Sequence, residues 1–382
     1  MRGLLLLLLC AIFLAVRVQS SDSIRAWDFG HDTIDADGVG GCLEKEIVSL
    51  PGENHWLCLR DSDLVSKSIM KKGYWTDCLD MLALWKAIHE GEQNAVAGVY
   101  VDIGANIGAC SIAMASNGIY TIAIEPVPSN LHYLTKSVLL NLEKGRPLPL
   151  TLYPYAVVEH ESTERVTMYQ QPGNYGNSMA NNPVADTDSK TGTESAMKKT
   201  NTTVHAFTAD QILVPLVGGL SPNRIRKRKQ QSYQSLRSRK SRQEVDILKI
   251  DVQGLETAVL KGAKQLLSLR LSKPKYIKSE IDPVRLFAQN TSALELVELL
   301  GNAGYVLMHT TKHYENSNFS QLDQLAANGL VYQLSSARTF REANLDLWRR
   351  YAAGVERASG KSGTLAADDF IARRRDMPAV DL

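Results

Sequence analysis

From residue 97 onward, short apolar runs alternate with longer stretches whose apolar residues recur at helical spacing. Strands are expected over GVYVDIG and YTIAIEP, each followed by a helix, over ACSIAMASNG and SNLHYLTKSVLLNLEKG. The rhythm resumes after residue 244 with strands at VDILKID and YIKSEID, and with strand-like YVLMHT and GLVYQL near the end. Strands that alternate with helices form parallel sheets with right-handed crossovers. The pattern therefore predicts an α/β fold with a mostly parallel, doubly wound sheet.

Changes in composition outside this rhythm indicate how the chain is organised. Residues 21–95 are mixed: CLEKEIVSLPGENHWLCLR predicts two short strands around a Pro-Gly turn, and DCLDMLALWKAIHEG predicts a helix. Residues 183–203 and 221–243 are polar or basic, and we expect them to be exposed loops inserted into the domain. The domain itself is expected over 96–335, followed by a charged tail over 336–382.

The first 20 residues have the pattern of a secretory signal peptide. Residues 1–2 are a short basic start, residues 3–16 are apolar, and residues 18–20 fit a small-residue cleavage site. A transmembrane span needs about 20 apolar residues, more than this run, although an uncleaved signal-anchor stays open. No later segment is apolar enough to span a bilayer. The protein is therefore expected in the lumen of the secretory pathway or secreted, with a Golgi or endoplasmic reticulum anchor as the alternative.

Cysteine usage agrees with an oxidising compartment, which favours disulfides. Removal of the signal peptide leaves Cys42, Cys58, Cys78 and Cys110, and four cysteines allow three pairings. Cys42 and Cys58 are close enough to pair locally, whereas Cys110, beside a glycine motif, is expected to be a buried small side chain. No C-x-x-C pair occurs, so no metal site is expected. Sequons that permit glycosylation stand at Asn201, Asn290 and Asn318.

The net charge of +2 is unevenly distributed. Nine Lys and Arg residues and no acid lie between Arg224 and Arg242, which leaves a net charge of about −7 on the rest of the chain. This basic insert is interpreted as a solvated loop, with contact to an acidic partner as the alternative. Because aromatic residues are almost absent from it, nucleic acid is not specifically indicated.

The stretch YVDIGANIGACS carries the first candidate chemistry. Asp102 to Gly108 would span the end of the first strand and the start of its helix, where open parallel sheets bind ligands. Gly104 would let the chain turn sharply, and Gly108 would let the helix start close to strand and ligand. Glu125 ends the second strand, 23 residues beyond Asp102. A carboxylate there can accept both ribose hydroxyls of an adenosine-containing ligand.

The glycine spacing decides between two such ligands. A dinucleotide fingerprint is G-x-G-x-x-G, whereas this chain has Gly104, Asn106 and Gly108 at alternate positions, preceded by Asp102. That pattern is poorly suited to bind the pyrophosphate of a dinucleotide. An acidic residue beside the turn instead suits the ammonium of S-adenosylmethionine. An NAD-dependent oxidoreductase stays as a rival interpretation.

Several segments together resemble FkbM-type methyltransferases: VDIGANIGACSIAMA, AIEPVPSNLHYL, LYPYAVVEHESTERVTMY, NYGNSM and VDILKIDVQGLETAVLKGA. The resemblance covers roughly residues 97–335, and KIDVQGLE is its most specific part, although many relatives have Glu where this chain has Gln253. It implies a Rossmann-like class I methyltransferase fold with an antiparallel C-terminal edge strand. It also implies S-adenosylmethionine as cofactor, an adenine edge near Tyr155 and Ala156, and cofactor contacts at Asp102, Gly104, Asn106, Gly108 and Glu125.

Methyl transfer from a sulfonium is a direct displacement, so the protein mainly aligns the acceptor and excludes water. A sugar hydroxyl is a poor nucleophile, and a base helps. The catalytic candidates are Asp251 at the end of LKID and Glu280 at the end of YIKSE. Their alternatives are a helix-capping or loop-bracing role for Asp251 and a salt bridge from Glu280 to a neighbour such as Lys249.

The loop PGNYGNS is expected to lie over the site, with Asn177 or Ser178 touching acceptor or cofactor, whereas His132 and His160 are interpreted as structural. The sequence thus predicts an S-adenosylmethionine-dependent O-methyltransferase that acts on a carbohydrate hydroxyl. The sugar acceptor follows from the resemblance and the compartment, not from particular residues. A secreted binding protein that keeps the fold without turnover is the rival from a different class.

Overall fold

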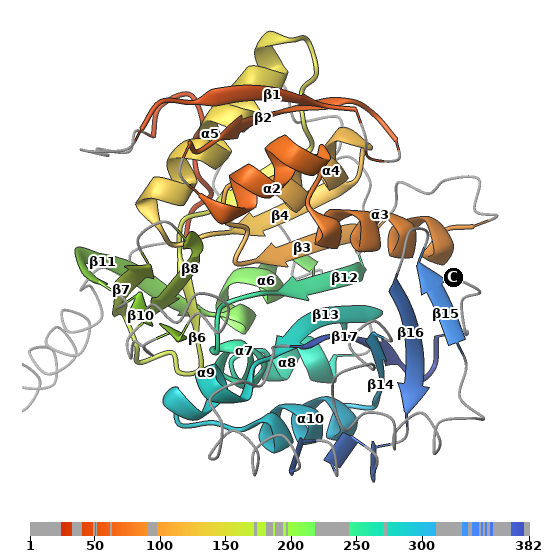
Figure 1. Ribbon diagram of the computed structural model, residues 1–382. Coiled ribbons are helices and arrows are strands. Elements are labelled where there is room, and N and C mark those ends of the chain that lie inside the picture. Colours follow the sequence, from red (N-terminus) through yellow and green to blue (C-terminus); the bar gives the residue numbers. More distant parts are fainter. Residues whose placement is uncertain are drawn as a thin grey trace, which may run out of the picture.

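A computed structural model describes the greater part of the chain (Figure 1). The described residues are 24–32, 40–48, 50, 52–61, 63–90, 98–171, 174–180, 186–187, 194–195, 198–217, 244–269, 273–310, 331–334, 338–343, 345–346, 348–349, 352–353 and 368–377. The expected signal peptide and the basic insert lie outside these residues.

A nine-stranded sheet forms the centre of the described structure, in the order β15-β16-β14-β17-β13-β12-β3-β4-β5. Strands β13, β12, β3, β4 and β5 run parallel to one another, which confirms the predicted α/β class. The bounds of the sheet strands are β3 Val99–Ile103, β4 Tyr120–Ile124, β5 Leu150–Tyr153, β12 Val245–Ile250, β13 Tyr276–Ile281, β14 Tyr305–Thr310, β15 Val331–Leu334, β16 Arg338–Ala343 and β17 Asp368–Arg374.

The C-terminal segment differs from the expectation of a charged tail after residue 335. Strand β17 is antiparallel and lies between β13 and β14 instead of at the edge, and β16 pairs with β14. Phe370, Ile371 and Ala372 of β17 are fully buried. The three apolar residues stand between acidic and basic neighbours, and such a short run gives almost no periodic signal.

Helices cover both faces of the sheet (Figure 1), and alternate residues of each strand supply two separate cores. Val99, Val101 and Ile103 of β3 pack with α6, α7 and α10, whereas Tyr100 packs with α3, α4 and α5. Odd and even positions of β3 therefore serve opposite faces. The helices are α2 Leu64–Lys72, α3 Thr76–Ile88, α4 Ala109–Ser116, α5 Pro128–Glu143, α6 Ala209–Val217, α7 Glu256–Lys261, α8 Lys264–Ser268, α9 Pro283–Ala288 and α10 Ala293–Asn302.

Two disulfides hold the N-terminal region. Strands β1 (Leu43–Ile47) and β2 (His55–Leu59) form the expected hairpin, and the Cys42–Cys58 disulfide confirms the predicted local pairing. The expectation for Cys110 is wrong, because Cys110 of α4 forms a disulfide with Cys78 of α3. The two helices pack side by side, and the partners lie 32 residues apart, so no local pattern reveals the bond.

A smaller four-stranded sheet, in the order β6-β11-β7-β8, stands beside the main one. The expected loop over the site is largely strand β8, and the segment 183–203, expected as a loop, includes the short pair β9–β10 and the start of β11. The bounds are β6 Ala156–Val158, β7 Arg165–Gln171, β8 Asn174–Ala180, β9 Asp186–Thr187, β10 Glu194–Ser195 and β11 Lys198–Thr208. Among all helices described, none has the length and apolar character needed to cross a bilayer.

Candidate active site

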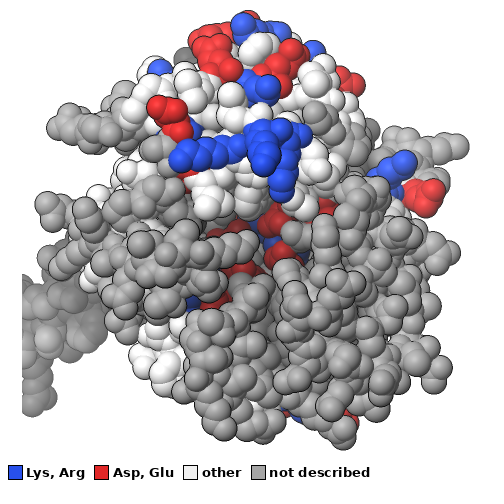
Figure 2. All heavy atoms as spheres, in the orientation of Figure 1, with Lys and Arg blue, Asp and Glu red and all other residues white. Residues whose placement is uncertain are grey.

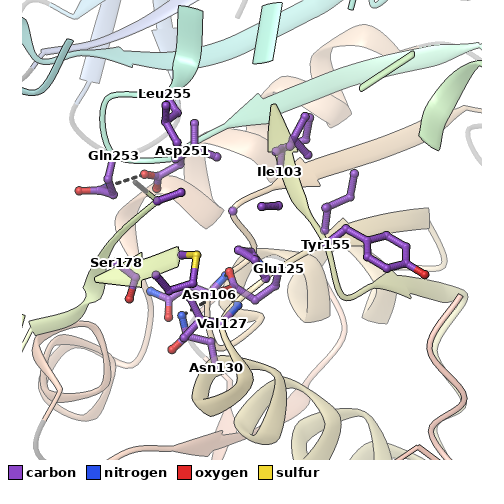
Figure 3. Close-up of a pocket in the computed structure, with 18 residues that line it drawn as sticks. Ile103, Asn106, Glu125, Val127, Asn130, Tyr155, Ser178, Asp251, Gln253 and Leu255 are labelled. Atoms are coloured by element: carbon purple, nitrogen blue, oxygen red, sulfur yellow. Dashed lines mark hydrogen bonds between the residues drawn. The ribbon is translucent and has the colours of Figure 1, made fainter. Parts of the chain in front are cut away.

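Two adjoining hollows open where the carboxyl ends of β3, β4 and β12 meet. One, of about 590 Å³, lies beside Glu125 and Ala156, and we call it the cofactor hollow (Figure 3). The other, of about 810 Å³, lies beside Lys249 and Glu280, and we call it the acceptor hollow. Both are lined by Gly104, Asn106, Asp251 and Gln253. They therefore form one cleft with a shared central wall.

The glycine loop makes the sharp turn that its sequence predicts. Gly104 has a φ of 82°, and a Cβ there would lie 1.9 Å from the carbonyl oxygen of Asp251. Gly108 has a φ of 85°, and a Cβ there would lie 2.8 Å from Cγ of Leu134. The neighbouring atoms and the left-handed backbone conformation thus both exclude larger residues at these two positions. Contact of these residues with the cofactor stays a prediction.

Glu125 is buried at the end of β4 and holds the glycine loop in place. Its Oε2 accepts a hydrogen bond from the Asn106 backbone N–H (2.8 Å), and its Oε1 accepts from Val127 N–H (2.9 Å) and Asn130 Nδ2 (3.2 Å). Burial raises the pKa of Glu125 to about 7, although these hydrogen bonds oppose the shift. Figure 3 shows Glu125 beside Asn106 and Asn130 at the cofactor hollow. The expected contact with ribose hydroxyls stays a prediction.

Asp102 already has a cation beside it. Its carboxylate accepts a hydrogen bond from Ser111 Oγ (2.7 Å) and lies 3.2 Å from Nζ of Lys249. The Lys249 ammonium also lies 3.4 Å from Oδ2 of Asp251. Burial alone would lower the pKa of Lys249, but Asp102 and Asp251 raise it above its ordinary value. A ligand ammonium near Asp102, as the sequence predicts, would share the carboxylate with Lys249.

Lys278 of β13 belongs to no recognisable sequence motif and is buried next to this cluster. Its Nζ lies 2.8 Å from Asp77 of α3 and 2.6 Å from Asp369 of β17. Burial would lower the pKa of Lys278, but these two carboxylates raise it well above its ordinary value. The sequence signal for this cluster is limited to a charged residue inside the strand YIKSE. Its partners come from α3 and β17, far away in the chain.

Asp251 and Glu280, the two catalytic candidates, both line the acceptor hollow. Burial would raise the pKa of Asp251, but Lys249 and Lys278 outweigh it and hold this pKa below its ordinary value. In contrast, burial together with Asp251 and Asp369 raises the pKa of Glu280 well above its ordinary value. The pKa values of the two carboxyl groups in one hollow are therefore displaced in opposite directions.

The contacts support the alternatives for these two residues in part: Asp251 braces the following loop without capping the helix, and Glu280 forms a salt bridge with a neighbour other than Lys249. Asp251 Oδ1 accepts a hydrogen bond from Gln253 Nε2 (2.7 Å), and Leu255, not Asp251, is the N-cap residue of α7. Glu256 braces the intervening loop by accepting from the backbone N–H groups of Val252 and Gly254. Glu280 forms a salt bridge with Arg285, whose Nη1 lies 3.9 Å from Glu280 Oε2, and Lys249 pairs with Asp102 and Asp251 instead.

The remaining sequence candidates fall on different parts of the cleft. The backbone before β6 brings Tyr155 and Ala156 to the cofactor hollow, but the Tyr155 ring is directed away from Glu125 (Figure 3) and its hydroxyl donates to the Arg25 carbonyl. Asn177 lines the acceptor hollow and Ser178 the cofactor hollow. The linings of these two hollows do not include His132 or His160. Residues of the acceptor hollow that sequence reasoning missed are Leu64, Val65, Trp75 and Arg285.

Fold and cleft together define a class I methyltransferase architecture. The sequence matches the methyltransferase FkbM domain family over residues 102–307, which is more than half of the chain. The protein therefore belongs to this family and is a methyltransferase whose cofactor is S-adenosylmethionine. A search of curated proteins found no match to this chain.

Solved methyltransferase structures show only distant similarity. FkbM from Methylobacillus flagellatus KT is 12% identical, with a TM-score of 0.27 over 67% of this chain and 48% of that one. Precorrin-6y C5,15-methyltransferase from Geobacter metallireducens GS-15 is 11% identical, with a TM-score of 0.32 over 83% and 93% of the two chains. Phosphoethanolamine N-methyltransferase 2 from Haemonchus contortus, solved with S-adenosylhomocysteine, is 9% identical, with a TM-score of 0.33 over 82% and 58%. Family membership therefore rests on the domain match.

The residues of the cleft fit S-adenosylmethionine. Asn106 Oδ1 is buried on the wall between the hollows and has no hydrogen-bond partner among the described residues, so it is available to a ligand donor. Gly104 leaves the turn beside it without a side chain. Glu125 offers a carboxylate on the cofactor side. In the part of the chain described, no three His, Cys, Asp or Glu side chains are grouped to hold a metal ion.

Proposed function

We propose that this methyltransferase transfers its methyl group to a hydroxyl oxygen of a carbohydrate in the secretory pathway. The observation that carries the proposal is the opposite displacement of the Asp251 and Glu280 pKa values within one hollow. Pairs of carboxyl groups with such displaced values take separate acid and base roles. These shifts favour the ionised form of Asp251 and the protonated form of Glu280.

The separate roles of the Asp251 and Glu280 carboxyl groups follow from these protonation states. S-adenosylmethionine, when bound, would supply an activated methyl group whose bond to the sulfonium sulfur breaks as the acceptor oxygen attacks, leaving the neutral thioether of S-adenosylhomocysteine. Asp251 accepts a hydrogen bond from the acceptor hydroxyl and takes its proton as the oxygen bonds to the methyl carbon. That proton becomes strongly acidic during the transfer, so a carboxylate with a low pKa suffices. Glu280 donates a hydrogen bond to a neighbouring oxygen of the acceptor and so orients it.

The lining of the acceptor hollow supports a sugar as the acceptor. Trp75, Leu64 and Val65 line this hollow together with the polar side chains of Asp251 and Glu280. A lining that combines an aromatic side chain with carboxyl groups matches a pyranose, which has apolar C–H faces and a hydroxylated edge.

The two disulfides support the proposed compartment. Cys42–Cys58 and Cys78–Cys110 include all four cysteines outside the expected signal peptide. Structural disulfides persist in secretory compartments and are rare in the cytosol. Together with the hydrophobic start of the chain, they favour a lumenal or secreted enzyme.

Incubation of the purified protein with methyl-labelled S-adenosylmethionine and a panel of glycans tests the proposal. We expect label on at least one glycan with the wild type and little label with Glu125→Ala, which loses the carboxylate of the cofactor hollow. Calorimetric titration with both S-adenosylmethionine and NAD accompanies the assay. Binding of the donor without transfer to any glycan favours the binding-protein alternative, and binding of NAD alone favours an oxidoreductase.

A further inference from the structure

Helix α2 forms part of the rim of the acceptor hollow. Its first two residues, Leu64 and Val65, line the hollow together with Trp75. The buried carboxylate of Asp63 caps the helix by accepting from Ser66 N–H at 3.1 Å. These contacts fix the N-terminal end of α2 at the hollow, so that the helix leads away from it.

The outer face of α2 carries a row of lysines. Lys67 and Lys71 follow Leu64 at intervals of three and seven residues, which places all three on one exposed face, while Ser66 and Ile69 are buried on the other. With a rise of 1.5 Å per residue, Lys67 and Lys71 stand about 4.5 and 10.5 Å beyond Leu64 along the axis. We call Lys67 and Lys71 the lysine row.

The charge of this row is not compensated within the described structure. Helix α2 contains no acidic residue, and neither Lys67 nor Lys71 has a carboxylate partner among the residues described. Lys72, in the last turn of α2, adds a third exposed cation. Figure 2 shows Lys and Arg side chains grouped above a hollow in which Asp and Glu side chains are visible. The buried Lys249 and Lys278 differ, since each is held by two carboxylates.

The difference in charge between the rim and the lining of the acceptor hollow indicates which kind of ligand binds. The cations that line the hollow, Lys249 and Arg285, already have carboxylate partners, whereas Lys67 and Lys71 have none among the described residues, so an anionic group is favoured at the rim and not next to the reacting atoms. We propose that α2 binds an acidic glycan, whose sulfate or carboxylate groups lie along Lys67 and Lys71 while an uncharged sugar hydroxyl enters the hollow. This inference rests on the proposed carbohydrate O-methylation and specifies its acceptor class.

The geometry favours a glycan chain over other polyanions. The cations form a single row that points to the hollow, which suits a linear ligand with charges spaced along it. The exposed apolar residues of α2 are Leu64 and Met70, and the helix has no aromatic side chain on which bases would stack. Asp251, with 29% of its side chain exposed, is reached only by a group that enters the hollow. A membrane would present a flat surface to the rim and would not enter it.

Binding of two matched probes tests the inference: a heparin-derived oligosaccharide and its desulfated, N-acetylated counterpart. The full-length wild type is compared with Lys67→Gln/Lys71→Gln and with the control Lys86→Gln/Lys264→Gln, which removes two exposed lysines from α3 and α8. We expect the lysine-row variant to bind the sulfated probe about tenfold more weakly at low salt, with the difference shrinking at high salt. The control is expected to stay within about twofold of the wild type.

An equal loss of affinity for the sulfated probe in the lysine-row variant and in the control would overturn the inference. The basic insert and the overall positive charge of the surface would then explain the binding. Preference of the row for RNA or for phosphatidylserine vesicles over the sulfated probe would overturn it as well. Label transfer from S-adenosylmethionine is measured in the same samples. Equal transfer of the label to the sulfated and the desulfated probe would contradict the role of the lysine row but not the proposed methyl transfer. Binding of both probes and of S-adenosylmethionine without transfer of the label would contradict the proposed function.

Discussion

Lys249 of β12 is the register partner of Lys278 of β13, and each ammonium group lies between two carboxylates. The Lys249 ammonium joins Asp102 at the glycine loop to Asp251 at the acceptor hollow. Five elements, β3, β12, β13, α3 and β17, thus meet in one charged layer. This layer keeps Asp251 ionised, so the proposed proton acceptor depends on lysines that do not react.

Replacement of Lys278 by Met should destabilise the fold strongly. The variant leaves Asp77 and Asp369 without their shared cation, and loss of one partner from a buried ion pair costs about 3–5 kcal/mol. Urea unfolding followed by circular dichroism measures the change. The exposed Lys86→Met control should stay within about 0.5 kcal/mol of the wild type. Equal stability of Lys278→Met and the wild type would show that the charged layer is not a structural requirement.

Replacement of Glu280 by Gln should remove the alkaline limb of the pH–rate profile. Burial, Asp251 and Asp369 raise the pKa of Glu280 well above its ordinary value, so its proton is retained to higher pH and is lost as pH rises through the raised pKa. The proposed hydrogen-bond donor disappears with it, and the wild-type rate falls. A glutamine amide donates but does not ionise, so the variant should retain most of the neutral rate. An unchanged alkaline limb in the variant would assign that limb to another group.

Affinity for the methyl donor should rise with pH around the pKa of Glu125, which is about 7. Below that pH the carboxyl group is protonated, and above it the carboxylate accepts stronger, charge-assisted hydrogen bonds from ribose hydroxyls. We expect about a fivefold gain between acidic and alkaline sides of this pKa, measured by calorimetry. Glu125→Gln should give a flat profile. A pH-dependent profile in that variant would contradict the assignment.

The two disulfides should differ in what they stabilise. Loop-closure entropy gives about 4 kcal/mol for Cys78–Cys110, with a separation of 32 residues, and about 3 kcal/mol for Cys42–Cys58, with 16. Double Ser variants of each pair, compared by denaturant unfolding, measure both values. Because Cys110 also lines the acceptor hollow, only loss of Cys78–Cys110 should weaken acceptor binding. Equal loss of acceptor binding in both variants would indicate a general effect of stability.

Trp75 should affect the acceptor and not the donor. Trp75→Ala removes the aromatic wall of the acceptor hollow, and we expect the glycan KM to rise about tenfold, while Trp75→Phe recovers most of the loss. Calorimetry should give a donor Kd within about twofold of the wild type for both. A matching loss of donor affinity would place the effect in the fold instead of the acceptor contact.

The predictable part of the molecule is the part with local signals. The parallel strands, the turn at Gly104 and the strand-end position of Glu125 follow from runs of apolar residues and from glycine conformation. The position of β17, the Cys78–Cys110 bond and the Lys278 cluster do not, because each depends on residues brought together from distant parts of the chain. Trp75 was missed because an aromatic residue before a helix is usually a packing residue.

The rate of a single turnover with Asp251→Asn tests the central claim most directly. Protein loaded with labelled S-adenosylmethionine is mixed with an accepted glycan, and donor occupancy and label transfer are followed in the same sample. We predict full occupancy in both proteins and a transfer rate about 10²–10⁴-fold lower in the variant, as expected for loss of a proton acceptor. Equal rates would contradict the account, because the hydroxyl would then react without Asp251.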